Sequence, residues 1–143
     1  MKTILAPLKD TTPTQWFVYI AFYFCWGITM NWIGQELAIA KFTYWWQVIT
    51  TYVLYMVPIS ILLRPYPIHT QYAYGLIAMG LLEFGGYTLK TSYIYPDNIL
   101  ERWFGAHVFA LCMTLFFAWY FPLGNYVVNR IFMPLIDKSK KNN

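Results

Sequence analysis

Four long apolar runs, separated by short polar breaks, limit what this chain can fold into. They cover residues 14–35, 43–63, 71–92 and 103–123. Each is close to the roughly 20 residues that an α-helix needs to cross the hydrocarbon core of a bilayer. Because backbone N–H and C=O groups cannot stay unpaired in lipid, a helix is the expected form of each run. The sequence therefore predicts an all-α polytopic membrane protein, in which residues 1–143 form a single domain built as a four-transmembrane-helix bundle.

The composition indicates that lipid, not a large protein interior, covers these runs. Of the 143 residues, 59% are hydrophobic and only 11% are charged, whereas soluble domains carry about 25% charged residues. So short a chain has too little interior to bury this much apolar surface. Beyond the fourth run, residues 126–136 are apolar but too few to span. They predict a short C-terminal interfacial helix or a continuation of the fourth span.

The basic residues predict the orientation in the membrane. Four spans place both termini on one side. Seven basic residues fall on that side, namely Lys2, Lys9, Arg64, Arg130, Lys138, Lys140 and Lys141, and three fall on the other, namely Lys41, Lys90 and Arg102. Because Lys and Arg are in excess in cytoplasmic loops, both termini are expected in the cytoplasm, in a bacterial inner membrane or in the endoplasmic reticulum.

Two further features concern the basic residues. The ending Lys140-Lys141-Asn142-Asn143 resembles the di-lysine retrieval signal of endoplasmic-reticulum proteins, although a basic cytoplasmic tail is the simpler explanation. The basic side chains lie in loops and tails rather than along one face. We therefore expect no binding of nucleic acid.

Glu83 lies near the middle of the third run and is the strongest indication of a functional site. A carboxylate at the centre of a membrane helix costs roughly 2.5–3.5 kcal/mol on insertion scales, so such residues usually face a bundle interior or a wet cavity. Gly75, Met79, Gly86 and Lys90 share one helical face with Glu83. The glycines on this face leave room beside the acid, which we expect to point toward neighbouring helices.

The candidate site combines Glu83 with polar residues of the predicted outer half. We expect Glu83 to act as a proton donor, with His107 or Asp97 completing a catalytic relay. The candidate substrate-binding residues are Asn31, Glu36, Gln47, Tyr87 and Lys90. Structural alternatives remain open. Glu83 could instead hydrogen-bond to Asn31 or Gln47 and hold the helices in register, and Asp97 could be the N-cap of a helix that leads into the fourth run.

A stripe of small residues in the fourth run predicts close helix packing. Ala106, Ala110, Thr114 and Ala118 recur every four residues, so they lie on one face of a helix. Small side chains let membrane helices approach closely. This pattern indicates a packing surface and no particular chemistry.

Metal and cofactor chemistry is not expected. The two histidines, His69 and His107, fall on opposite sides of the predicted membrane, and the two cysteines, Cys25 and Cys112, fall inside predicted spans. Cysteines in such positions are usually small buried apolar residues, and a metal centre needs more ligands at closer spacing. We therefore expect neither a metal nor another cofactor.

These features favour an integral membrane enzyme that performs acid–base chemistry on a lipid-soluble, isoprenoid- or sterol-like substrate around Glu83. Isomerisation, hydration or cyclisation of an alkene needs a proton donor, a proton acceptor and aromatic faces that stabilise a cation. A metal-independent isomerase, lyase or cyclase would meet this description. The alternatives are a small proton-coupled transporter and a non-catalytic subunit or assembly factor. The expected partners are the bilayer and a lipophilic small molecule, and a homodimer or a larger membrane complex remains open.

Overall fold

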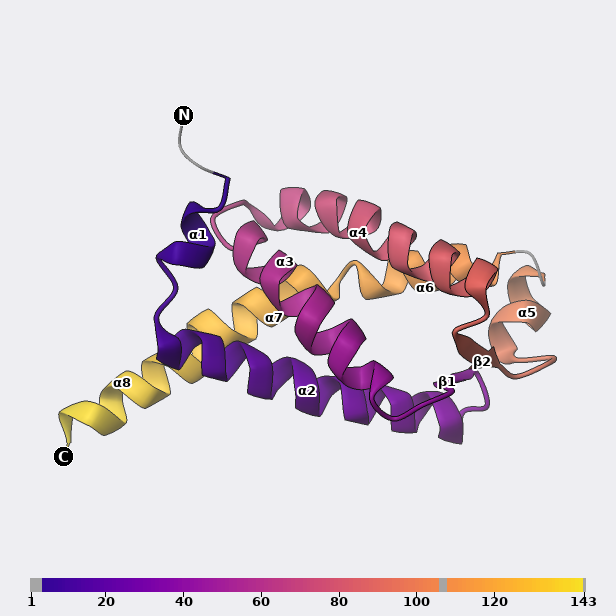
Figure 1. Ribbon diagram of the computed structural model, residues 1–143, viewed down its shortest axis with the longest axis horizontal. Coiled ribbons are helices and arrows are strands. Elements are labelled where there is room, and N and C mark those ends of the chain that lie inside the picture. Colours follow the sequence, from indigo (N-terminus) through magenta and orange to yellow (C-terminus); the bar gives the residue numbers. More distant parts are fainter. Residues whose placement is uncertain (1–3, 106–107, 143) are drawn as a thin grey trace.

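The computed structural model describes residues 4–105 and 108–142 and is 76% helical (Figure 1). The elements, in chain order, are α1 (Ala6–Lys9), α2 (Pro13–Glu36), β1 (Ala40–Phe42), the π-helix η1 (Ile49–Met56), α3 (Val57–Leu63), α4 (Ile68–Leu89), β2 (Ser92–Ile94), α5 (Ile99–Phe104), α6 (Phe109–Phe117), α7 (Tyr120–Val127), the π-helix η2 (Val128–Phe132) and α8 (Met133–Lys141). Figure 1 shows that the long helices run along the length of the molecule. Both ends of the chain lie at one end of the molecule, and β1, β2 and α5 lie at the other, which we call the strand end.

The first apolar run forms α2, nearly as predicted. Its start is set by a capping box, because the Thr12 hydroxyl accepts a hydrogen bond from the Gln15 N–H and the Gln15 side chain accepts one from the Thr12 N–H. Pro13 follows at the first helical position, where its missing N–H costs nothing. At about 1.5 Å per residue, its 24 residues span roughly 36 Å.

The second run begins its helix later than predicted. Residues 43–46 form a bend and a turn, residues 47–48 are helical, and the helix continues through η1, from Ile49, into α3. Pro58 explains the π-helical turns before it. The proline nitrogen cannot donate to the Leu54 carbonyl, and its ring would clash with that carbonyl in a regular α-helix. A wider turn leading into the proline relieves the clash.

The third run forms α4, but its last predicted residue, Ser92, lies in a short strand that the sequence did not predict. The helix ends at Lys90 in the left-handed conformation, with φ of 53°. Ser92–Ile94 then forms β2, which pairs antiparallel with β1, so that Lys41 lies opposite Tyr93. The two chain segments leave α2 and α4 at the same end, and pairing satisfies their backbone N–H and C=O groups. The bulk of the molecule remains helical.

The fourth run is divided into two parts. Its first residues belong to α5, which ends at Gly105 with φ of 90°, and a second helical segment starts at Phe109 and extends to Lys141. The apolar residues 126–136 are therefore a continuation of this segment and not a separate interfacial helix. Within residues 4–105 and 108–142, two helices, α2 and Phe109–Lys141, are both long and apolar enough to cross a membrane.

Pro122 interrupts the last helical segment between α6 and α7. It has no N–H to donate to the Ala118 carbonyl, and the Trp119 N–H turns back to the Phe116 carbonyl at 3.2 Å. The Leu115 carbonyl, which loses its helical donor, accepts a hydrogen bond from the Tyr72 hydroxyl at 3.0 Å. A side chain of α4 thus replaces a helical hydrogen bond lost at the break.

The small-residue stripe packs α6 against α4, as predicted. Ala110, Thr114 and Ala118 are all buried, while Ala106 lies outside the described residues. The close approach depends on Gly75, because a methyl group added there would lie 2.9 Å from the Ala118 carbonyl oxygen and 2.8 Å from Phe121 Cδ2. Small residues on both helices therefore allow the backbones to meet.

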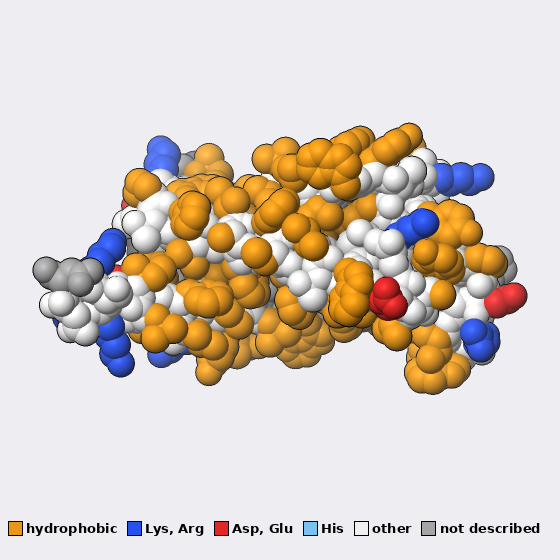
Figure 2. Space-filling view, turned by 90° about the horizontal axis from the view of Figure 1, so that it is seen from below, with side chains coloured by type: hydrophobic (Ala, Val, Ile, Leu, Met, Phe, Trp, Pro, Cys, Tyr) orange, Lys and Arg blue, Asp and Glu red, His pale blue; other side chains and the backbone are white. Residues whose placement is uncertain are grey.

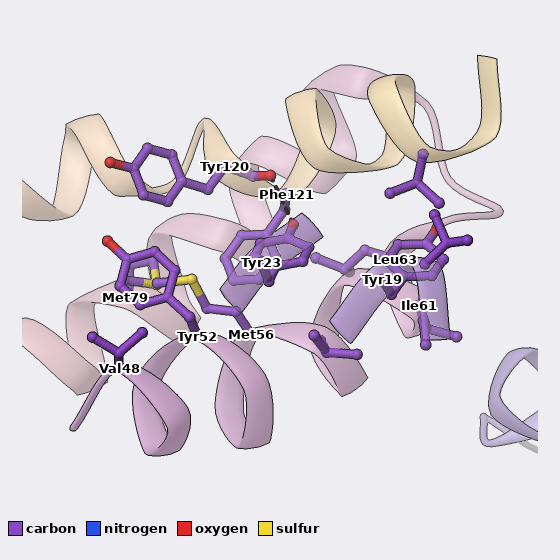
Figure 3. Close-up of a cluster of buried hydrophobic side chains, with 13 residues drawn as sticks. Tyr19, Tyr23, Val48, Tyr52, Met56, Ile61, Leu63, Met79, Tyr120 and Phe121 are labelled. Carbon is purple, nitrogen blue, oxygen red and sulfur yellow. Dashed lines mark hydrogen bonds between the residues drawn. The ribbon is translucent and has the colours of Figure 1, made fainter. Parts of the chain in front are cut away.

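The core is a cluster of buried side chains shared by the long helices (Figure 3). Its fully buried side chains include Tyr19, Tyr23, Met56, Ile61, Met79, Phe121 and Val128. They come from α2, the η1–α3 helix, α4 and the α7–η2 segment. This part of the protein is therefore solidly packed.

A buried hydrogen-bond network centred on Asn125 locks this core. The Asn125 carbonyl oxygen accepts from the Tyr19 hydroxyl at 2.7 Å, and its amide donates to the Ser60 carbonyl at 2.9 Å and to the Gln71 side chain at 2.8 Å. The Tyr23 hydroxyl donates to the main chain of α7 at 2.8 Å, a bond drawn in Figure 3. Four helices are thus joined through satisfied polar groups, which fix their relative register.

The surface separates into an apolar middle and charged ends. Figure 2 shows Lys, Arg, Asp and Glu side chains near both ends of the molecule and hydrophobic side chains over the middle of this face. Large apolar side chains such as Phe17, Leu54, Ile77 and Leu81 are more than 60% exposed. In α2, only 22% of the most apolar stretch is buried. A helix of a soluble core would be mostly buried, so this pattern is typical of a protein surrounded by lipid.

Candidate functional site

A cavity of about 810 Å³ lies at the strand end of the molecule, next to the packed core. Its walls come from the last turns of α2, from β1, η1 and β2, from the second half of α4 and from α6. Cavities that bind small molecules typically measure about 300–1,000 Å³ and have mostly apolar walls with a few polar groups. The size and position of this cavity make it the candidate functional site.

Glu83 faces this cavity from α4 and is partly buried. It is the only acidic residue among the described residues that line the cavity. In the described part of the chain, its carboxyl group has neither a hydrogen-bond partner nor an ion pair within 4 Å. A carboxyl group in a mostly apolar cavity, with no protein partner, is available to a bound molecule.

Aromatic side chains form much of the wall around Glu83. The rings of Phe42 and Tyr52 meet edge to face with their centroids 6.3 Å apart. The ring centroids of Phe116 and Phe117 are 5.6 Å apart. Such ring faces carry partial negative charge and attract cations. The wall is therefore suited to an extended apolar molecule and to a positive charge that develops on it.

Tyr120 lies behind this wall and carries an unusual hydroxyl group. Its ring centroid is 6.2 Å from that of Tyr52 and 5.7 Å from that of Trp26. The hydroxyl is buried, and it has no hydrogen-bond partner among the described residues. In Figure 3 the hydroxyls of Tyr52 and Tyr120 point to the same side of the core cluster. Nothing in the sequence pattern distinguishes this tyrosine from the other twelve.

Asn31 and Gln47, two of the four predicted substrate-binding residues that line the cavity, also hold its frame together. Asn31 accepts a hydrogen bond from the Phe42 N–H at 2.9 Å. Gln47 accepts one from the Tyr44 N–H at 2.8 Å and donates one to the Thr91 carbonyl at 2.6 Å. These bonds tie the loop after α2 to the end of α4. Neither side chain is hydrogen-bonded to Glu83, so the predicted register-holding bond is not formed.

The remaining predicted residues divide into three groups. Tyr87 and Lys90 line the cavity together with Glu83. Glu36 and Asp97 are exposed and are not among the lining residues. His107 lies outside the described residues.

The predicted N-cap was wrong by one residue. Asn98, not Asp97, caps α5, because its side-chain oxygen accepts hydrogen bonds from the N–H groups of Leu100 and Glu101. Asp97 instead takes the left-handed conformation, with φ of 55°. Its carbonyl accepts a hydrogen bond from Arg102 Nε at 2.7 Å. Asp and Asn both occur readily at caps and in left-handed turns, so the sequence alone did not separate their roles.

Sequence reasoning missed Lys41 as a cavity residue. This lysine lines the cavity from β1, and its ammonium group lies 5.4 Å from the Tyr93 ring centroid and 5.7 Å from that of Tyr95. The alternation Tyr93-x-Tyr95 was the available signal, but it is too short to predict a strand pair. Within the described residues, no three His, Cys, Asp or Glu side chains lie close enough to hold a metal ion.

Comparisons of the chain with protein-family models, with curated proteins and with solved structures found no match. The geometry of the cavity is therefore the basis for assigning a function.

Proposed function

We propose that the protein crosses a membrane four times and that both termini face the cytoplasm. The proposal is supported by the apolar middle of the molecule and by the position of both chain ends at one end (Figures 1 and 2). The helices α2 and Phe109–Lys141 meet the criteria of length and apolarity. At about 1.5 Å per residue, the 22 residues of α4 also extend over roughly 33 Å, close to the thickness of a hydrocarbon core.

We further propose that the protein is a metal-independent enzyme that isomerises, hydrates or cyclises an isoprenoid- or sterol-like molecule. The observation that carries this proposal is the cavity at the strand end, which has aromatic walls and only one acid, Glu83, among its described lining residues. A lipid-soluble alkene fits such walls, and Glu83 is the group placed to move a proton.

The simplest reaction of this class is a double-bond shift. The protonated Glu83 carboxyl donates its proton to one alkene carbon, a new C–H bond forms, and a tertiary cation develops on the neighbouring carbon. The ring faces of Tyr52 and Phe116 stabilise this cation. The Glu83 carboxylate then removes a proton from an adjacent carbon, which forms the shifted double bond and restores the acid. A single residue therefore closes the proton balance, and Asp97, which lies outside the cavity, is not required.

The packed core favours an enzyme over a transporter. A transporter needs a path from the cavity to the opposite side, whereas Tyr23, Met79 and Phe121, from α2, α4 and α7, are fully buried in the core. A rearrangement that opens such a path would also have to break the bonds of Asn125. A subunit whose site is already filled by packing would not be expected to keep an 810 Å³ cavity.

Proton exchange with an isoprenoid tests the enzymatic proposal. Purified protein in phosphatidylcholine nanodiscs is incubated in D2O with farnesol, and deuterium at carbon is measured by mass spectrometry. We expect incorporation by the wild type and at least a hundredfold loss in Glu83→Gln, since general acid–base catalysis contributes roughly 10²–10⁴ in rate. Glu101→Gln, which changes an acid outside the cavity lining, is the matched control. Equal incorporation by wild type and Glu83→Gln would refute the assignment.

A further inference from the structure

Two lysines line the cavity at the strand end of the molecule. Lys41 lies on β1, and Lys90 directly follows α4, where its side chain is exposed. Both belong to the cavity lining. No ion pair within 4 Å neutralises either ammonium group among the residues that the structure describes. The cavity thus has a positively charged end where its wall reaches the surface.

Aromatic contacts hold Lys41 in place. Its ammonium group lies over the rings of Tyr93 and Tyr95, whose centroids are 5.0 Å apart and whose planes are nearly perpendicular. A cation over a ring keeps its N–H donors free for a second partner. The pairing of β1 with β2 therefore positions a charged donor at the cavity instead of letting it extend freely into water.

Hydroxyl groups surround the same end of the cavity. Thr43, Thr91 and Ser92 all line it. The Thr43 hydroxyl donates to the Thr91 carbonyl at 3.3 Å and the Thr91 hydroxyl to the Gly86 carbonyl at 3.5 Å, so among the described residues it is the Ser92 hydroxyl that keeps its proton for a ligand. Ammonium and hydroxyl donors together are the groups that bind carboxylate and phosphate oxygens in proteins. This end of the cavity therefore has the chemistry of an anion site, whereas the aromatic wall has the chemistry of an apolar site.

The helix sets the distance between the two regions. Lys90 follows Glu83 by seven residues and caps the C-terminus of α4, so their backbone positions are separated by roughly 10 Å at 1.5 Å per residue. A molecule bound at both places would hold its anionic group about two turns from the carbon that Glu83 protonates.

We propose that the ligand of this cavity is an anionic amphiphile, whose carboxylate or phosphate head binds Lys41 and Lys90 and whose apolar tail extends along the aromatic wall to Glu83. This inference rests on the proposed function and specifies its substrate class. The head group anchors the molecule at the surface end, and the anchoring sets which carbon of the tail reaches the acid.

Three ligands with one tail test the head-group preference. Farnesol, farnesoic acid and farnesyl phosphate are titrated by calorimetry into the protein in phosphatidylcholine nanodiscs, and empty nanodiscs correct for partitioning into lipid. We expect at least one of the two anions to bind the wild type roughly tenfold or more tightly than farnesol, the gain of one charge-assisted hydrogen bond. The acid and phosphate arms show which anion is preferred. Equal affinity of all three would overturn the inference.

Charge removal tests the assigned residues. In the double variant Lys41→Met, Lys90→Met, the affinity for the preferred anion should fall to that for farnesol, while farnesol itself binds as before. Arg102→Met removes a cation from the same end but outside the cavity lining and should leave every affinity unchanged. The single variant Lys90→Asn, at an exposed position, provides the same comparison if the double variant does not fold. An undiminished preference for the anion in both lysine variants would contradict the inference.

The farnesol measurements separate this inference from the proposed function. If farnesol binds and its deuteration depends on Glu83 while the anions bind no better, only the head-group inference is wrong. If none of the three ligands binds above the empty-nanodisc background, the proposed function itself fails.

Discussion

Asn125 uses both ends of its side-chain amide inside the packed core. Its partners come from α2, α3 and α4, so replacing it leaves buried donors and acceptors on three other helices without partners. Interhelical hydrogen bonds in membrane proteins average about 0.6 kcal/mol each, and an unsatisfied buried group costs about 1–3 kcal/mol. The residue therefore matters more through what it leaves unpaired than through any single bond.

We predict that Asn125→Leu lowers the free energy of unfolding by about 1–3 kcal/mol. Thermal unfolding in detergent, followed by tryptophan fluorescence, measures the loss. Tyr126→Phe is the control, because this neighbouring side chain is 58% exposed and its change should leave the midpoint as it is. Unchanged stability of Asn125→Leu would show that the network contributes no net energy.

Tyr23 and Tyr120 provide a matched pair of buried hydroxyls. The Tyr23 hydroxyl donates to the Tyr120 carbonyl, whereas the Tyr120 hydroxyl has no partner among the described residues. Tyr23→Phe should destabilise the protein by about 0.5–1.5 kcal/mol, while Tyr120→Phe should be neutral or stabilising, because it removes an unsatisfied polar group. The same unfolding assay compares the two variants. A larger loss for Tyr120→Phe would mean that its hydroxyl is bonded in solution.

At the scale of elements, proline positions and small residues determine how the helices bend and meet. Pro58 follows the π-helical turns of η1, and Pro122 opens the break between α6 and α7. Tyr72 compensates for that break from α4. The contact between α4 and α6 is therefore made by backbone and small side chains, so it is sensitive to added volume.

Two glycines of α4 test this sensitivity. Gly75→Ala should destabilise by about 1–3 kcal/mol, because the new methyl group would press on the Ala118 carbonyl and on Phe121, and backbone cannot move aside as a flexible side chain can. Gly85→Ala should instead stabilise by up to about 1 kcal/mol, since nothing lies within 4 Å of the added group and alanine favours the helix. Equal effects at both positions would argue against close contact between α4 and α6.

At the scale of the whole molecule, the proposed topology places the two ends on opposite faces of a membrane. Ser139 lies near one end in α8, and Pro96 lies in the loop after β2 at the other. Both side chains are exposed. They can therefore report sidedness without disturbing the core or the cavity.

Cysteine labelling tests this arrangement. In a background of Cys25→Ala and Cys112→Ala, a membrane-impermeant maleimide should label Ser139→Cys only in inside-out vesicles and Pro96→Cys only in right-side-out vesicles. Solubilised protein, in which both should react, is the control. Labelling of both cysteines from the same side would mean an even number of crossings between residues 96 and 139, and would contradict the proposed topology, in which the last span alone lies between them.

Part of the site followed from local pattern. Glu83, Asn31, Gln47, Tyr87 and Lys90 line one cavity; the sequence grouped them because the predicted spans place all five in the outer half. Glu36 and Asp97 do not line the cavity. Glu36 ends α2 and Asp97 lies in a turn, and both side chains are exposed. The direction of such side chains depends on the conformation of the adjoining loop. Sequence pattern reports periodicity within a helix, but it does not report the course of a loop.

The sequence by itself determined that the molecule is mostly helical and apolar, that α2 begins after Thr12, and that small residues such as Ala110 and Thr114 form a packing face. These properties depend on residues close together in the chain. Only the tertiary structure decided that β1 pairs with β2, that Lys41 joins Lys90 at one cavity, and that this cavity adjoins a packed core. Those properties depend on which distant segments meet, and contact between distant segments is set by the volume and hydrogen bonding of the whole bundle.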